Sequence, residues 1–107
     1  MESFSTAGNR QHPELCIGML TLWLHLEGCR SLKEKRQRIG GLRERFGKQP
    51  HLAVCESGTP DQHDKSEWTF VCAAAQRTLV ERTLGDVEQH MAAAIDAVIY
   101  DRQLEFL

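Results

Sequence analysis

The segment LCIGMLTLWLHL, residues 15–26, is the feature that most constrains how this chain folds. Every second residue from Leu20 to Leu26 is a leucine, whereas the positions between them hold a threonine, a tryptophan and a histidine. Successive side chains of a β-strand point to opposite faces. The alternation therefore predicts a strand whose leucine face is buried under other elements, with a mixed face on its other side.

Apolar residues at helical spacing predict a helix directly after this strand. Ser31 is suited to cap it, and we expect it to run to about Gly47, although Gly40 and Gly41 each cost about 1 kcal/mol relative to alanine. Lys35 falls within the apolar stripe, so its ammonium group is expected to extend past the sheet edge or to pair with a carboxylate. The stripe itself consists of Leu32, Ile39, Leu42 and Phe46.

A second helix and three further strands follow. Thr78 and Glu81 have the spacing of a capping box, which predicts that the second helix begins there. Its apolar face consists of Val80, Leu84, Val87, Met91 and Ile95. The strands are predicted at residues 51–56, 67–75 and 98–107.

The resulting order, β-α-β-β-α-β, predicts the fold class. Two strand–helix–strand units with right-handed crossovers give a four-stranded antiparallel sheet with both helices on one face. This is an α+β, two-layer, ferredoxin-like sandwich. We expect residues 14–107 to form this single domain, and residues 1–13, which are polar and aperiodic, to be a disordered arm.

Several function classes are not expected from the sequence. The spacing of the four cysteines contains no CxxC pair, which argues against a zinc ribbon or a thioredoxin motif. The absence of a phosphate-binding loop, a dinucleotide fingerprint and a nucleophile elbow predicts a protein that is not an enzyme and holds no cofactor. Neither a secretory signal nor a membrane-spanning stretch is visible, so we expect a cytoplasmic protein with reduced thiols and no membrane partner.

The run HLEGCRSLKEKR, residues 25–36, resembles the YlxP-like family of small bacterial proteins, a domain of unknown function. The shared pattern is a strand ending in histidine, a short glycine loop and then Ser-Leu-Lys-x-Lys-Arg. A second family block is only partly kept, because Gly58 stands where an acidic residue is usual and His63 where a tryptophan is usual. The resemblance implies the ferredoxin-like fold and no established activity. The family's gene neighbourhood, among translation and ribosome-maturation genes, implies a link to RNA.

A basic segment makes an anion-binding site the first candidate. Residues 30–48 carry eight basic and two acidic side chains in a chain of net charge −2. A glycine loop lets the backbone approach a ligand, and free N–H groups at a helix N-terminus attract anions. The candidate phosphate-binding residues are Gly28, Arg30, Ser31, Lys33 and Arg36. The alternative is a glycine turn, a serine cap and a solvated basic helix.

The same helix predicts a nucleic-acid interface as the second candidate. Arg36 and Arg43 share one flank of the apolar stripe, and Arg38 and Arg45 share the other. Such a surface can contact the phosphates of RNA, free or in a ribosomal particle. The alternative is a solvated charged face, neutralised by the acidic second half of the chain.

The uncovered sheet face is the third candidate. Its predicted residues are Met19, Trp23 and His25, joined by Trp68 and Phe70 if the strand register allows. An exposed face of this kind favours homodimerisation, through this face or through a strand edge, over stacking on RNA bases.

The loop containing Glu56, Asp61, His63 and Asp64 has metal-ligating side chains, but such residues are also common turn formers, and no metal is expected.

The sequence therefore favours a small cytoplasmic binding protein that associates with RNA or the ribosome through its basic first helix. The alternative is a structural homodimer or a protein-interaction module with no role in nucleic-acid binding. A more remote alternative is an acylphosphatase-like phosphate hydrolase that uses the loop from Gly28 to Arg36.

Overall fold

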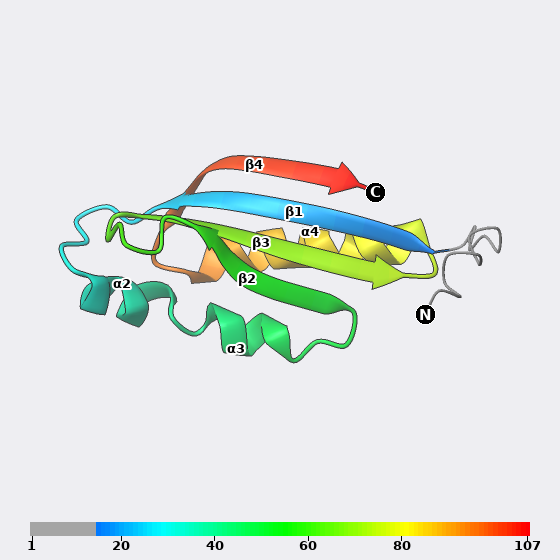
Figure 1. Ribbon diagram of the computed structural model, residues 1–107, viewed down its shortest axis with the longest axis horizontal. Coiled ribbons are helices and arrows are strands. Elements are labelled where there is room, and N and C mark those ends of the chain that lie inside the picture. The colour runs from blue at the N-terminus through cyan, green and yellow to red at the C-terminus, as the bar shows by residue number, and fades with distance from the viewer. Residues whose placement is uncertain (1–14) are drawn as a thin grey trace, which may run out of the picture.

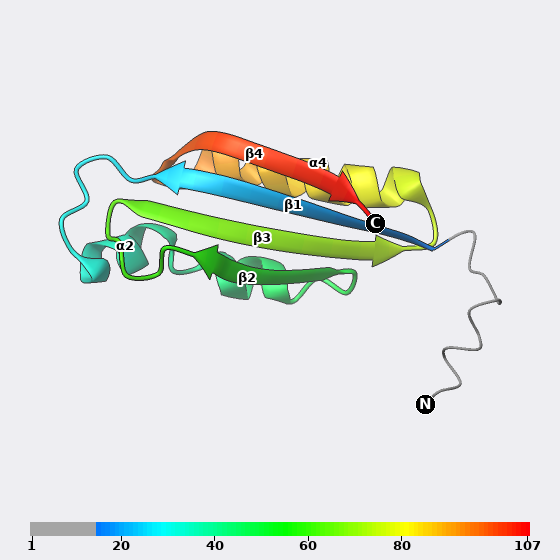
Figure 2. The same cartoon turned by 45° about the horizontal axis from the view of Figure 1, so that its top comes forward.

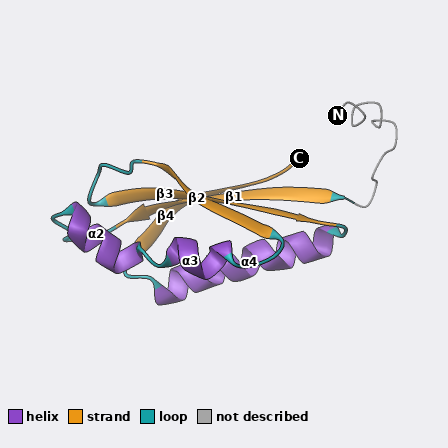
Figure 3. Cartoon of the chain, turned by 60° about the horizontal axis from the view of Figure 1, so that its bottom comes forward, coloured by secondary structure: helices purple, strands orange, loops and turns teal. Residues whose placement is uncertain are grey.

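The computed structural model describes residues 15–107, and the predicted arm at residues 1–13 lies outside this range. The elements are β1 (Cys16–His25), α2 (Leu32–Ile39), α3 (Leu42–Gly47), β2 (Leu52–Gly58), β3 (Lys65–Ala74), α4 (Arg77–Ala94) and β4 (Val98–Phe106). The strands form one antiparallel sheet in the order β2-β3-β1-β4 (Figures 1 and 2). The helices cover a single face of that sheet (Figure 3), which confirms the α+β ferredoxin-like sandwich.

The leucine face of β1 is the centre of the core, as the alternation predicts. Leu20, Leu22, Leu24 and Leu26 are each at most 1% exposed. Burying one such side chain contributes about 1.5–3 kcal/mol. Above them, α4 contributes its buried stripe of Val80, Leu84, Val87 and Met91.

The register of β1 with β3 places two aromatic residues in this core. Trp68 lies opposite Leu22, and Phe70 lies opposite Leu20. Directly opposite residues in an antiparallel pair share a face, so both aromatic rings are buried beneath the helices. The prediction that Trp68 and Phe70 join the uncovered face is therefore wrong. The ring of Phe70 instead packs edge-to-face on Phe46 of α3, at 5.4 Å between centroids.

The predicted single helix from Ser31 to Gly47 is divided into α2 and α3. The N–H of Gly40 donates to the carbonyl of Arg36 at 2.7 Å, and this closes α2. A Cβ on Gly40 would collide with that same carbonyl oxygen, so the turn requires glycine. α3 then begins after Gly41, which supplies no side-chain cap.

α4 begins two residues earlier than its predicted cap. Gln76 is the N-cap residue, and its side chain makes no capping hydrogen bond. The carboxylate of Glu81 pairs with Arg77 at 3.0 Å, so the capping box predicted for Thr78 and Glu81 is wrong.

The first testable prediction concerns Gly18, where β1 lies closest to α4. A Cβ on Gly18 would lie 2.7 Å from Cγ1 of Val80 and 3.0 Å from Cδ1 of Leu84. We expect Gly18→Ala to lower the free energy of unfolding by about 1–3 kcal/mol through overpacking, measured by urea denaturation. Val80→Ala should destabilise this variant less than it destabilises the parent chain, because the new methyl fills part of the space that the substitution opens.

Gly85→Ala is the matched control, because a Cβ at that exposed position of α4 meets nothing within 4 Å. It should raise stability by about 0.5–1 kcal/mol. An unchanged unfolding midpoint for Gly18→Ala would contradict the close approach.

Candidate functional site

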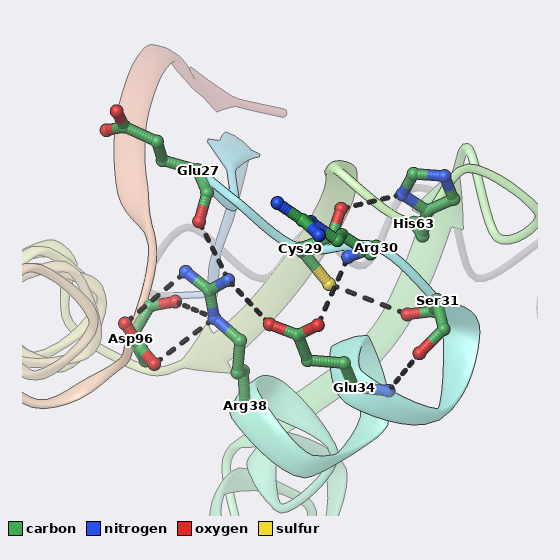
Figure 4. A network of polar contacts seen from close by, with 8 residues as sticks. All are labelled: Glu27, Cys29, Arg30, Ser31, Glu34, Arg38, His63 and Asp96. Atoms are coloured by element: carbon green, nitrogen blue, oxygen red, sulfur yellow. Dashed lines mark hydrogen bonds and ion pairs between the residues drawn. The ribbon is translucent and has the colours of Figure 1, made fainter.

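At the loop between β1 and α2, where the sequence predicts a phosphate site, side chains of the chain itself accept from two backbone N–H groups. The chain turns at Gly28, whose φ is 75°. The hydroxyl of Ser31 accepts the N–H of Glu34 at 3.0 Å, and the Glu34 carboxylate accepts the N–H of Arg30 at 3.1 Å (Figure 4). The pair of bonds resembles a capping box, except that Glu34 accepts from the residue before the N-cap Ser31 and not from Ser31 itself. The Glu34 carboxylate places a negative charge at the start of α2, which opposes a bound anion, whereas the side chains of Arg30 and Lys33 are exposed.

Arg38, a candidate for the nucleic-acid surface, is held in a network of contacts within the chain. Its side chain is only 13% exposed. The guanidinium contacts the carboxylate of Asp96 at 3.2 Å, the carbonyl of Glu27 at 2.9 Å and the carboxylate of Glu34 at 3.5 Å (Figure 4). Arg38 therefore ties α2 to the β1–α2 loop and to the connection between α4 and β4. Most of its donors are engaged within the chain, which argues against the predicted role of Arg38 in binding phosphates.

Arg45 also faces α4. Its guanidinium lies 5.8 Å from the ring centroid of Phe46, and the same ring packs edge-to-face on the imidazole of His90 at 5.3 Å between centroids. Partial burial and, to a smaller extent, the charge of Arg45 lower the pKa of His90.

Burial raises the pKa of the Cys72 thiol, which remains a neutral core group.

A groove of about 650 Å³ lies beside the first two helices. We call it the cationic groove. It runs along α2 and α3 on one side and along the β2–β3 end of the sheet on the other. Its lining residues are Leu32, Lys35, Arg36, Ile39, Gly40, Gly41, Arg43, Glu44, Glu56, Pro60 and Trp68. Arg36 and Arg43, predicted to share a flank, line it together.

A buried ion pair forms one end of the cationic groove. The Lys35 ammonium, on a side chain 5% exposed, lies 3.0 Å from Oε2 of Glu56 and donates to the carbonyls of Thr59 and Gln62 at 2.9 Å each. The hydroxyl of Ser66 donates to the same Glu56 oxygen at 2.9 Å. A buried charge is tolerated only when it is paired and hydrogen-bonded. Lys35 therefore joins α2 to the β2–β3 turn and contributes no free charge to the groove.

Arg36 and Arg43 supply the free positive charge. Both are exposed, and within residues 15–107 neither lies within 4.0 Å of a carboxylate oxygen. Glu44 lines the same groove without pairing to either of them. Guanidinium groups bind phosphate through paired, directional N–H donors. The groove therefore combines two unpaired arginines with an apolar floor.

Two of the four metal-ligating side chains predicted between β2 and β3 make other contacts. Glu56 is held by Lys35 and Ser66, and Nδ1 of His63 lies 2.8 Å from the carbonyl oxygen of Cys29. No group of three metal-ligating side chains forms in the part of the chain that the structure describes.

The uncovered sheet face carries a chain of hydrogen bonds instead of an apolar patch. Nε1 of Trp23 donates to Glu67 at 3.0 Å, and the other oxygen of that carboxylate accepts from Ser57 at 2.9 Å. Thr69 donates to Ser57 and contacts Thr21 at 3.1 Å. Met19 and His25 are half-buried on the same face.

The sequence did not predict that residues of β2 and β3 line the cationic groove together with α2 and α3. Glu56 and Trp68 reach it only through the β2–β3 register, which pairs them. The one available signal was Lys35, whose position within an apolar stripe required a buried partner.

Comparisons with known proteins give a family and several similar solved structures. The family described as "Protein of unknown function (DUF503)" matches residues 17–104. The solved structure titled "Solution structure of SecDF periplasmic domain P4" is 14% identical, with a TM-score of 0.43, and the match covers 84% of this chain and 87% of that one. No curated protein matches the chain. None of the described helices is long and apolar enough to cross a membrane.

The second testable prediction concerns the buried pair. Lys35→Met leaves the Glu56 carboxylate without its cation, so we expect a loss of about 3 kcal/mol in the free energy of unfolding. Glu56→Gln in the same chain should cost much less than it does alone, because the two side chains are coupled. Lys33→Met, at an exposed position of α2, is the control and should change stability by less than about 0.5 kcal/mol. Additive effects of Lys35→Met and Glu56→Gln in urea denaturation would contradict the pairing.

Proposed function

The chain belongs to the family described as Protein of unknown function (DUF503), and we propose that within this family it is a non-catalytic module that binds single-stranded RNA. The observation that carries the proposal is the placement of Arg36 and Arg43. They come from different helices and line one groove, and neither has a carboxylate partner in the described range. The proposal places the protein in the cytoplasm, with its RNA either free or part of a ribosomal particle.

The charge distribution supports this proposal. Three further cations of the basic segment, Arg30, Lys33 and Lys48, are exposed on the loop or on the α2 and α3 segment. The rest of the chain is acidic, and the net charge is −2. A positive region on an acidic molecule orients a polyanion toward one face and limits non-specific attraction elsewhere. RNA therefore has one preferred surface to contact.

The third testable prediction is that Arg36→Glu combined with Arg43→Glu weakens RNA binding about tenfold or more at low salt, because carboxylates repel the phosphates that the arginines would neutralise. The measurement is fluorescence anisotropy of a short labelled single-stranded RNA over a range of salt concentrations. The slope of log affinity against log salt should also become shallower, by about 0.7 for each phosphate that the variant no longer neutralises.

The control carries the same change of charge at two exposed positions that do not line the groove, Lys65→Glu with Arg82→Glu. It should bind RNA within a few-fold of the parent protein. Equal losses in the two double variants would mean that net charge alone attracts the RNA, and this would refute the proposal for the groove.

A homodimer is the second candidate function, and β4 favours it. This strand is an edge of the sheet, and its exposed side chains include Val98 at 59%, Tyr100 at 53% and Leu104 at 38%. Leu15 and Leu107, also exposed, lie at the end of the sheet where β4 finishes beside β1. An edge strand offers unpaired N–H and C=O groups to another strand. We infer that a second copy of the chain pairs along β4.

The fourth testable prediction is that Tyr100→Lys with Leu104→Lys converts this dimer to a monomer, because charged side chains oppose pairing at a strand edge. Sedimentation equilibrium measures the mass. Val71→Lys, on the uncovered face, should leave the dimer intact. Dissociation by Val71→Lys alone would assign the interface to the uncovered face, and a monomeric parent protein would remove this second candidate.

A further inference from the structure

The cationic groove has the size and the walls of a pocket for a single base. Its volume of about 650 Å³ lies within the range usual for small-ligand sites. Leu32 and Pro60 are its less buried apolar lining residues, and the buried Ile39 and Trp68 form its floor. Ile39 and Trp68 are each 4% exposed, so the floor is a fixed part of the core. Single-stranded RNA is recognised when an unstacked base enters a pocket of this kind.

One hydrogen-bond acceptor in the groove is left over from the buried network. Oε2 of Glu56 accepts from both Lys35 and Ser66. Oε1 of the same carboxylate accepts no hydrogen bond from residues 15–107, and the Glu56 side chain is 19% exposed. Lys35 and Ser66 hold the carboxylate in place. A fixed carboxylate oxygen accepts a hydrogen bond from the exocyclic amino group of a base, such as N4 of cytosine.

We propose that the cationic groove binds one amino-bearing base of single-stranded RNA, with Glu56 accepting from its amino group and with Arg36 and Arg43 on the adjoining phosphates. This inference rests on the proposed function, because it requires that RNA bind at the groove. The base enters between Leu32 and Pro60. The two arginines stand on either side of the α2–α3 break, where the glycines keep the groove free of side chains.

The fifth testable prediction compares oligocytidylate with oligouridylate of equal length. The two carry the same phosphates and differ at position 4 of the base, which is an amino group in one and a carbonyl in the other. We expect the parent protein to bind oligocytidylate about fivefold or more tightly in fluorescence anisotropy, since one matched base contact is worth roughly that factor. Gly41→Phe, which adds a side chain to the groove at a position where a Cβ meets nothing within 4 Å, should abolish this preference.

Gly85→Phe is the matched control, because it adds the same ring at an open position of α4 that does not line the groove. It should keep the full preference for oligocytidylate. A second measurement uses the Trp23→Phe protein, in which Trp68 is the only tryptophan. Its emission should change on adding oligocytidylate, and this change should disappear when Gly41→Phe is added.

The outcomes separate the inference from the proposed function. Equal affinity for the two oligonucleotides, or a preference that survives Gly41→Phe, would overturn the base pocket while leaving backbone binding at the arginines intact. Failure of the parent protein to bind either oligonucleotide at low salt would overturn both.

Discussion

The pairing of β1 with β3 in a single register decides which side chains the helices cover. It aligns the leucines of β1 with Trp68 and Phe70, so that two central strands present one continuous apolar face. A shift by one residue would turn every one of these side chains to the opposite face. The same register places Glu67 and Thr69 on the uncovered side, where they bond to Trp23 and Thr21. The β1–β3 register thus makes one face of the sheet apolar and the other polar.

The pair of Lys35 and Glu56 brings polar chemistry to the margin of this core. Lys35 lies on the apolar stripe of α2, and the two carbonyls and the carboxylate around it come from β2 and the turn that follows. Because the ammonium is neutralised there, the positive charge of the groove comes from Arg36 and Arg43 alone. The network also gives the Glu56 carboxylate a fixed orientation. The groove therefore holds both the positive charge of the two arginines and the oriented carboxylate of Glu56.

Much of the fold could be predicted from periodicity, but the contents of the groove could not. The leucine alternation and the stripe of α4 each constrain one element, and together they define the sandwich. Which residues of β3 face the helices depends on register, a pairing between distant segments that periodicity within one strand does not determine. Nothing in the sequence distinguishes Arg36 from Arg38. In the structure Asp96 and Glu27 lie beside Arg38 and bind its guanidinium, whereas Arg36 has no such partner among the described residues. The sequence shows that Gly40 and Gly41 lower the stability of a helix. It does not show that the helix ends there, because this depends on the close approach of Gly40 to the carbonyl of Arg36.

The two ends of the described chain leave the sheet on the same side of the molecule. The N–H of Leu107 donates to the carbonyl of Ile17, so the last residue lies next to the start of β1 (Figure 1). α2 lies at the opposite end, beside the turn between β2 and β3. A tether to a sensor surface, or a fluorescent protein fused after Leu107, would therefore project away from Lys35 and its surroundings. The C-terminal end of the sheet is therefore a suitable attachment point for immobilised or tagged forms of this domain.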